Sequence, residues 1–174
     1  AAYVMPERRT MQPMPMGGDG MPWVSVGPLV DMPHIFQNMG DGTFFHSGLL
    51  ALNYAAASPV NITYKILYNS HTSMTGGQEI MGAHPVADMV SDLLANGVKK
   101  VIVVMDHVTK AGEAKLVTHC DLPLTGRAVV RGVITDLGVF NVTGVAFEVV
   151  ELAPGVEYAE VVAKTAARLV DRIT

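Results

Sequence analysis

The sequence predicts an α/β fold, a mostly parallel three-layer sheet with helices on both faces and a more β-rich C-terminal portion. In the first part of the chain, short strand-like segments alternate with helical ones, which is the pattern of a parallel sheet. Val101 to Met105 form a continuous apolar run, as expected of a strand buried on both faces. Of the 174 residues, 49% are apolar and 16% are charged, a balance typical of a chain with a buried core.

The first half of the chain is expected to hold two strands and two helices. The strands fall at His34–Met39 and at Asn61–Tyr68, where the second is β-branched, aromatic and partly alternating. A helix is expected between them at His46–Ala57, ahead of a Ser-Pro pair. The pattern at Pro85–Asn96 predicts another helix, with Gly97 after its last turn. Its apolar residues recur at helical spacing: Val86, Met89, Val90, Leu93 and Leu94.

The composition changes near Gly97, because ten of the 11 methionines precede it and the chain beyond it is rich in Val, Ala and charge. We therefore divide the chain into segments 1–97 and 98–174, which can still share one continuous sheet. The second segment is expected to hold three short strands and a terminal helix, at Arg131–Thr135, Val139–Val142, Ala146–Leu152 and Glu157–Ile173.

Charge, hydropathy and cysteine content exclude several classes of protein. Twelve Lys and Arg against 16 Asp and Glu give a net charge of -4, which excludes the basic surface of a nucleic-acid binder. No apolar run reaches the roughly 18 residues of a membrane-spanning helix, and the first residues lack the apolar core of a signal peptide. The lone Cys120 excludes an internal disulfide and a Cys-based metal cluster held within this chain. We therefore expect a cytoplasmic protein that uses neither nucleic acid nor membrane.

Polar residues follow the first two expected strands. The Gly40-Asp41-Gly42 turn comes after the first and Asn69 after the second, so both lie at carboxyl ends of strands, where open α/β sheets bind ligands. Mg²⁺ prefers oxygen ligands and bridges carboxylates to phosphates, so Asp41, Asn69 and the carbonyl of His71 are candidate metal ligands. The two glycines let backbone N–H groups approach a diphosphate. His46 could donate a hydrogen bond there, and a purely structural role for it is an equal alternative.

Four stretches of the first segment carry a family resemblance: Met16–Gly20, His34–Gly48, Asn61–Asn69 and Met74–Gln78. They resemble the thiamine-diphosphate domain of indolepyruvate and other 2-oxoacid ferredoxin oxidoreductases. The resemblance implies thiamine diphosphate and Mg²⁺ as cofactors, with the diphosphate at Gly40 and Gly42 and the metal at Asp41 and Asn69. It implies oxidative decarboxylation of a 2-oxoacid to its acyl-CoA, with electrons passed to ferredoxin. Such enzymes also need a pyrimidine-binding half and iron–sulfur clusters, which partner chains would supply.

The second segment carries a different resemblance, in Lys99–His107, Cys120–Gly126, Ile134–Phe140 and Glu151–Val156. These stretches resemble the C-terminal part of the B subunit of the 3-oxoacid CoA-transferases, which transfer CoA between acids through a glutamyl-CoA intermediate. The nucleophilic glutamate of that family lies in a Glu-Asn-Gly triplet, which occurs nowhere in this chain. No catalytic residue is therefore assigned, and Glu148 and Glu151 are expected to be solvated. His107 lacks metal-ligand spacing with other histidines and is expected to be structural or exposed.

The two resemblances together predict a chimera joined near Gly97. The leading hypothesis is a cofactor-binding segment of a 2-oxoacid ferredoxin oxidoreductase. It would work in a homo- or hetero-oligomer with other subunits, and with ferredoxin and CoA as reaction partners. One alternative is a chain that is similar to the B subunit of a CoA-transferase but lacks the catalytic glutamate. Another is a non-catalytic interaction module that resembles a subunit.

Overall fold

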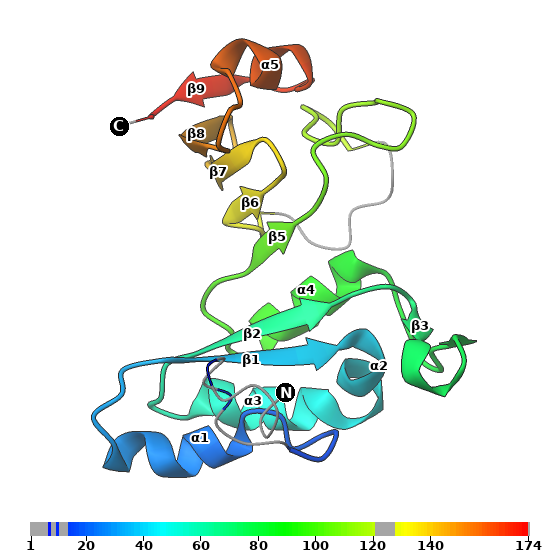
Figure 1. The fold of residues 1–174 in the computed structure, drawn as a ribbon, viewed down its shortest axis with the longest axis vertical. Coiled ribbons are helices and arrows are strands. Elements are labelled where there is room, and N and C mark those ends of the chain that lie inside the picture. The colour runs from blue at the N-terminus through cyan, green and yellow to red at the C-terminus, as the bar shows by residue number, and fades with distance from the viewer. Residues whose placement is uncertain (1–6, 8–9, 11–13, 121–127, 174) are drawn as a thin grey trace. The chain divides into compact units, whose positions relative to one another are not determined.

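The computed structural model describes residues 7, 10, 14–120 and 128–173, and the chain divides into two compact units, Ala1–His84 and Pro85–Thr174 (Figure 1). The α/β class is confirmed, since both units combine helices with strands. Of the Cys120–Gly126 stretch, all but the exposed Cys120 lies outside the described residues. In the described part of the chain, no helix is both long and apolar enough to span a membrane.

Unit 1 is built on two parallel strands, β1 (Ile35–Gly40) and β2 (Ile62–Leu67), paired from Ile35–Ile62 to Gly40–Leu67. Both strands lie where the sequence predicts them. The helical connection between them starts earlier than expected, at Asp41 and not at His46. It comprises α2 (Asp41–Thr43), the π-helical turn η3 (Phe44–Gly48) and α3 (Leu49–Ala57). The earlier start follows from Asp41, whose carboxylate accepts the N–H of Gly42 and satisfies a donor of the first turn.

Helices cover one face of this strand pair. Figure 1 shows α3 and α1 (Met21–Val26) on the same side of β1 and β2, with the short turn η2 (Gly27–Leu29) following α1. Met39 of β1 is buried, and the lack of a side chain at Gly48 leaves room for its sulfur. The other elements of the unit are small: β3 (His71–Thr72), η4 (Ser73–Thr75) and β4 (Gln78–Glu79).

Unit 2 begins with α4 (Val86–Ala95), which confirms the helix predicted from its apolar spacing. Its end is also as predicted, because Gly97 takes a left-handed φ of 93°. The N–H groups of Gly97 and Val98 donate to the carbonyls of Leu94 and Leu93, at 3.1 and 3.0 Å. This pair of bonds is a Schellman motif, which requires a residue free to adopt positive φ.

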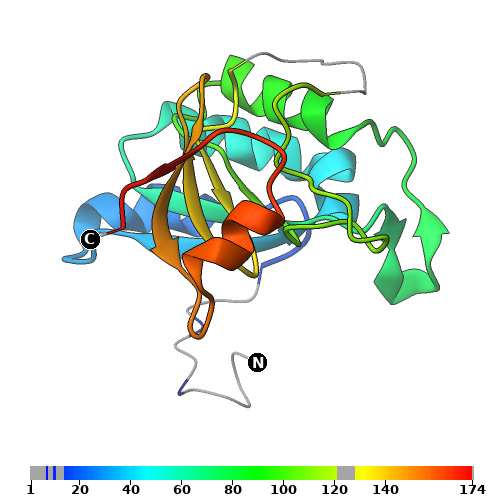
Figure 2. The same ribbon diagram turned by 90° about the horizontal axis from the view of Figure 1, so that it is seen from above.

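The rest of unit 2 is a five-stranded mixed sheet in the order β5-β6-β7-β8-β9. The β5–β6 and β8–β9 pairs are parallel, and the two central pairs are antiparallel. Figure 2 shows α5 (Tyr158–Ala163) lying across the sheet. The strands span Ile102–Val104, Gly132–Ile134, Gly138–Val142, Phe147–Leu152 and Leu169–Asp171. The β-rich C-terminal portion is thus confirmed.

Two details of this sheet differ from the sequence prediction. The strand predicted at Val101 to Met105 is not buried on both faces, since Ile102 is 45% and Val104 74% exposed. β5 lies at the edge of the sheet, where it pairs with β6 alone among the described strands. The expected terminal helix is also wrong, because α5 stops at Ala163 and the chain then forms β9. There Leu169 pairs with Phe147 of β8, so a strand edge competes successfully with helical periodicity.

The core of unit 2 forms between the sheet and α5. Phe140 of β7, Val149 of β8 and Val161 of α5 are fully buried and belong to one contiguous cluster. Burying such side chains contributes about 1.5–3 kcal/mol each. Leu116, Val133 and Leu137 complete the buried part of this cluster.

The close approach of β7 and β8 makes Gly138 sensitive to substitution. A Cβ at Gly138 would collide with the main-chain carbonyl of Glu151, whereas a Cβ at Gly132 on β6 would meet its nearest atom at an ordinary 3.6 Å. We expect Gly138→Ala to lower the free energy of unfolding by about 1–3 kcal/mol, because rigid backbone must move. Gly132→Ala is the matched control and should change stability little. Chemical denaturation checks both, and equal effects would contradict the packing described.

Candidate functional site

The structure brings Asp41 and Asn69 together beyond the carboxyl ends of β1 and β2, as predicted. Asp41 is 2% exposed, and both oxygens of its carboxylate accept backbone hydrogen bonds. Oδ2 accepts the N–H groups of Asn69 and Ser70 at 2.7 and 2.6 Å, and Oδ1 accepts that of Gly42 at 2.9 Å. The carboxylate therefore ties the end of β1 to the chain that leaves β2.

The side chain of Asn69 closes the neighbouring turn. Its Oδ1 accepts the N–H of His71 at 2.8 Å, and its Nδ2 donates to Ser73 Oγ at 2.9 Å. The ring nitrogen Nδ1 of His71 lies 3.0 Å from the carbonyl of Asn69. Between them, Ser70 has a positive φ of 66°, a strained conformation for a residue with a side chain. The amide thus holds a strained turn in place.

The other residues predicted for this site are spread around the turn. Gly40 is extended, with φ -77° and ψ 154°, and a Cβ at Gly42 would press on Thr72 Oγ1 at 3.1 Å. His46 Nδ1 lies 2.9 Å from Ser47 Oγ, so the imidazole has a local partner on its own helix. Among the described residues, no three His, Cys, Asp or Glu side chains are grouped so that they could hold a metal ion.

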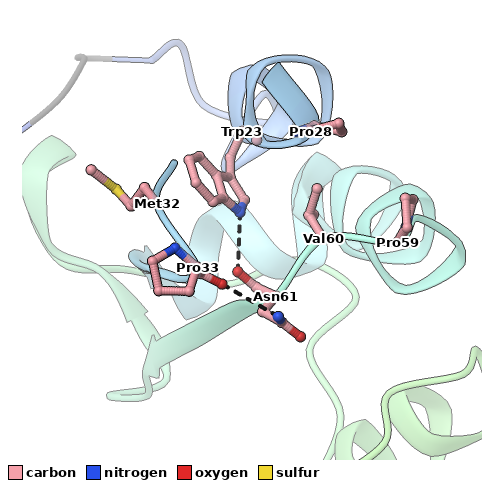
Figure 3. Close-up of a pocket in the computed structure, with 8 residues that line it drawn as sticks. Trp23, Pro28, Met32, Pro33, Pro59, Val60 and Asn61 are labelled. Carbon is pink, nitrogen blue, oxygen red and sulfur yellow. Dashed lines mark hydrogen bonds between the residues drawn. The ribbon is translucent and has the colours of Figure 1, made fainter. Parts of the chain in front are cut away.

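A cavity that the sequence did not predict lies at the amino ends of the same strands (Figure 3). Its volume is about 300 Å³. Trp23, in α1, forms one wall, and its indole N–H donates to the carbonyl of Asn61 at 3.0 Å. The side-chain amide of Asn61 donates to the carbonyl of Pro33 at 3.3 Å. No local pattern predicts the cavity because its walls come from three separate segments, which include Gly27, Pro28, Met32, Pro59 and Val60.

His107 is the centre of a polar cluster in unit 2. It follows β5, and its side chain has 0% exposure. Nδ1 lies 3.0 Å from Thr135 Oγ1, and Nε2 lies 2.9 Å from Thr165 Oγ1. The main-chain N–H of His107 donates to Asp136 Oδ1 at 2.7 Å. Of the two roles that the sequence allowed, the structural one is correct, but its partners are 28 and 58 residues away and gave no local signal.

Burial favours the neutral form of this imidazole. Burial lowers the pKa of His107, since a charged ring would lose its hydration. The negative charge of Asp136 opposes this effect and the positive charge of Lys164 adds to it. In turn, the hydrogen bond from the backbone N–H of His107 holds the pKa of Asp136 below its ordinary value.

Three of the four stretches that resemble the B subunit of CoA-transferases contact one another at and beside this cluster. His107 is the last residue of the stretch Lys99–His107, and its ring is hydrogen-bonded to Thr135 of the stretch Ile134–Phe140. The N–H of Ala153, in the stretch Glu151–Val156, donates to the carbonyl of Leu137 at 3.0 Å. Residues that are distant in sequence thus form one structural neighbourhood. The two glutamates considered for catalysis lie elsewhere on β8, as an exposed Glu151 and as Glu148, whose Oε1 is 3.4 Å from Arg172 Nε.

The geometry at Asp41 predicts a structural role that a single atom change can test. Asp41→Asn turns an acceptor into an NH₂ donor facing backbone N–H groups, so we expect a loss of about 1.5–3 kcal/mol in the stability of unit 1. Asn69→Ala is the control, because it keeps the main-chain donor to Asp41 and removes exposed bonds. Urea unfolding followed by the fluorescence of Trp23, the one tryptophan in the sequence, measures both. A larger loss for Asn69→Ala would contradict this geometry.

Comparison with known proteins gives the family. The model of the coenzyme A transferase family matches residues 30–164, which is more than half of the chain. The B subunit of succinyl-CoA:3-ketoacid coenzyme A transferase from Helicobacter pylori is 51% identical over 74 residues, 42% of this chain and 36% of the relative. The B subunit of 3-oxoadipate CoA-transferase from Pseudomonas putida is 37% identical over 128 residues, 68% and 56% of the two chains. The beta subunit of acetate CoA-transferase from Escherichia coli is 40% identical over 75 residues, 43% and 35%.

These matches correct the leading hypothesis. The family match includes Gly40, Asp41, Gly42 and Asn69, which had suggested a different family. A 2-oxoacid ferredoxin oxidoreductase function is therefore wrong, as are thiamine diphosphate and Mg²⁺ as cofactors and ferredoxin as a partner. The resemblance of the second segment is confirmed, although the chain spans only about a third to just over half of the length of these relatives. The chain belongs to the coenzyme A transferase family.

Proposed function

We propose that this chain is a B-type subunit of a CoA-transferase that handles CoA thioesters of short 3-oxoacids together with an A-type partner subunit. The family match over residues 30–164 carries the proposal. Several relatives are named as B or beta subunits, and their names give succinyl-CoA with a 3-ketoacid, 3-oxoadipate, and acetate as substrates. All of these substrates are small carboxylic acids or their CoA esters.

The polar neighbourhood in unit 2 supports the same proposal. Three stretches that resemble the B subunits lie in contact, through the bond of His107 to Thr135 and the bond of Ala153 to Leu137. We assign no ligand to the Asp41 turn, where Gly40, Gly42, His46, Asn69 and His71 remain candidates for contact with a substrate or a partner.

The absence of a Glu-Asn-Gly triplet supports a second candidate, a subunit that assembles without catalysing transfer. Transfer through a glutamyl-CoA intermediate needs a carboxylate nucleophile, and Glu148 is paired with Arg172 on the surface. In this alternative the chain associates with its partner, and the complex of the two chains does not transfer CoA.

Native mass spectrometry of the complex, together with a CoA-transfer assay on the same mixture, separates the two candidates. The chain is mixed with the A-type subunit of a 3-oxoacid CoA-transferase and with acetoacetyl-CoA. We expect a complex of the two chains and no covalent CoA adduct on this chain, because the nucleophilic glutamate of the family is missing. A complete B-type subunit that contains Glu-Asn-Gly is the positive control for the adduct.

Each outcome decides between the candidates. A complex that turns over succinyl-CoA and acetoacetate supports the transferase subunit, with its carboxylate outside this chain. A complex without turnover supports the non-catalytic subunit. No association with the A-type subunit would overturn the proposal, and a covalent adduct on this chain would overturn the second candidate, since it would show a nucleophile in this chain.

A further inference from the structure

The hydrogen-bond partners of His107 fix which of its nitrogens carries the proton. The hydroxyl of Thr165 donates its single proton to the carbonyl of Val161 at 2.7 Å, so at His107 Nε2 its oxygen can only accept. Nε2 must therefore be protonated. Thr135 Oγ1 accepts the N–H of Leu137 at 3.1 Å and has its own proton left to donate to Nδ1. The ring is thus neutral, with the hydrogen on Nε2.

This neutral ring joins three segments that are far apart in the chain. His107 follows β5, Thr135 follows β6, and Thr165 lies between α5 and β9. Main-chain hydrogen bonds hold the residues that follow Thr165. The N–H of Ala166 donates to the carbonyl of Leu116 at 2.9 Å, and the carbonyl of Arg168 accepts the N–H of Phe147 at 2.9 Å.

We propose that His107, Thr135 and Thr165 form an acid-sensitive latch, in which the neutral imidazole holds residues 165–171 against the sheet and its protonation releases them. The latch is a property of unit 2 itself, and it holds whether or not the chain takes part in CoA transfer.

Protonation is costly in the closed latch for two reasons. A proton on Nδ1 would force Thr135 to accept there as well, and its hydroxyl proton would lose its acceptor in a site that is 8% exposed. The charged ring would also sit without water beside Phe140, whose ring centroid is 5.3 Å away. Opening the segment lets water reach the imidazolium and removes both costs.

Charged groups on the surrounding elements act in opposite directions. Asp136, after β6, favours the protonated ring, and Lys164, at the end of α5, disfavours it. Lys164 is itself paired with Glu160 at 2.6 Å on the surface, which weakens its effect. On the segment of His107, the adjacent Asp106 is exposed, and Lys115 contributes a main-chain N–H to the His107 carbonyl at 3.2 Å.

The segment that opens includes a short edge strand of the sheet. β9 has three residues and pairs with β8 alone among the described strands, whereas β7 and β8 pair over five registered positions. Short edge strands open locally before a core does. Release of residues 165–171 therefore need not unfold β7 and β8.

Two measurements on the full chain test the latch. Long-range ¹H–¹⁵N NMR of the histidine rings reports which nitrogen of His107 is protonated. Amide hydrogen exchange, corrected for its intrinsic pH dependence, reports opening of Ala166 and of β9 between about pH 7.5 and pH 5. The wild type is compared with Thr165→Val, which removes the hydroxyl, and with Thr165→Ser, which keeps it.

We expect a protonated Nε2 and an unprotonated Nδ1 at about pH 7.5. Because one proton is taken up on opening, exchange of Ala166 and β9 should rise as the pH falls below about 6.5, by at most about tenfold for each pH unit. Thr165→Ser should behave like the wild type. In Thr165→Val the segment should open more at every pH, because the bond from Nε2 to the threonine hydroxyl is lost, while amides of Phe140 and Val149 stay protected.

Four results would overturn the latch. A proton on Nδ1 in place of Nε2 would contradict the bonding scheme. Equal opening in Thr165→Val and the wild type would show that the Thr165 hydroxyl does not hold the segment, and exchange in the wild type that does not depend on pH would place no titrating group in the latch. A parallel rise in the exchange of Phe140 and Val149 would mean that the unit unfolds as a whole.

Discussion

Unit 2 depends on the hydrogen bonding of one buried imidazole. A polar ring with no exposure destabilises a protein unless both nitrogens have partners, and His107 obtains them from Thr135 and Thr165. These partners belong to different parts of the chain, so the same bonds that satisfy the ring also fix the positions of the β6–β7 turn and of the chain after α5. Phe140 and Val161, which lie next to these segments in the sequence, are buried in the core of the unit.

Unit 1 uses the same principle with a carboxylate. Asp41 is buried, and its carboxylate accepts three backbone N–H groups, one from the residue after it and two from the chain that follows β2. Each bond satisfies a main-chain donor that has no partner in a helix or a strand. A turn whose pattern resembles a cofactor-binding turn thus has a structural role, in which one carboxylate satisfies three main-chain donors.

The sequence predicted the local structure well where one segment decides it. The α4 helix and its glycine end, and both strands of unit 1, follow from spacing and residue type. It failed where a distant partner decides, as at β9, whose apolar residues also fit a helix but gain a strand edge on β8. The contact of Asp41 with Asn69 was predictable because parallel strands end at the same edge. The partners of His107 were not, since nothing near it in sequence points to Thr165.

Thr135 and Thr165 stabilise unit 2 through one shared imidazole, and their coupling is therefore the central quantity to measure. A double-mutant cycle with Thr135→Val, Thr165→Val and the double variant, followed by chemical denaturation at neutral pH, measures it most directly. Hydroxyls that share His107 should be coupled by about 0.5–3 kcal/mol, because the second substitution removes a bond already weakened by the first. Strictly additive losses of stability would show that the two hydroxyls act independently and would contradict the account.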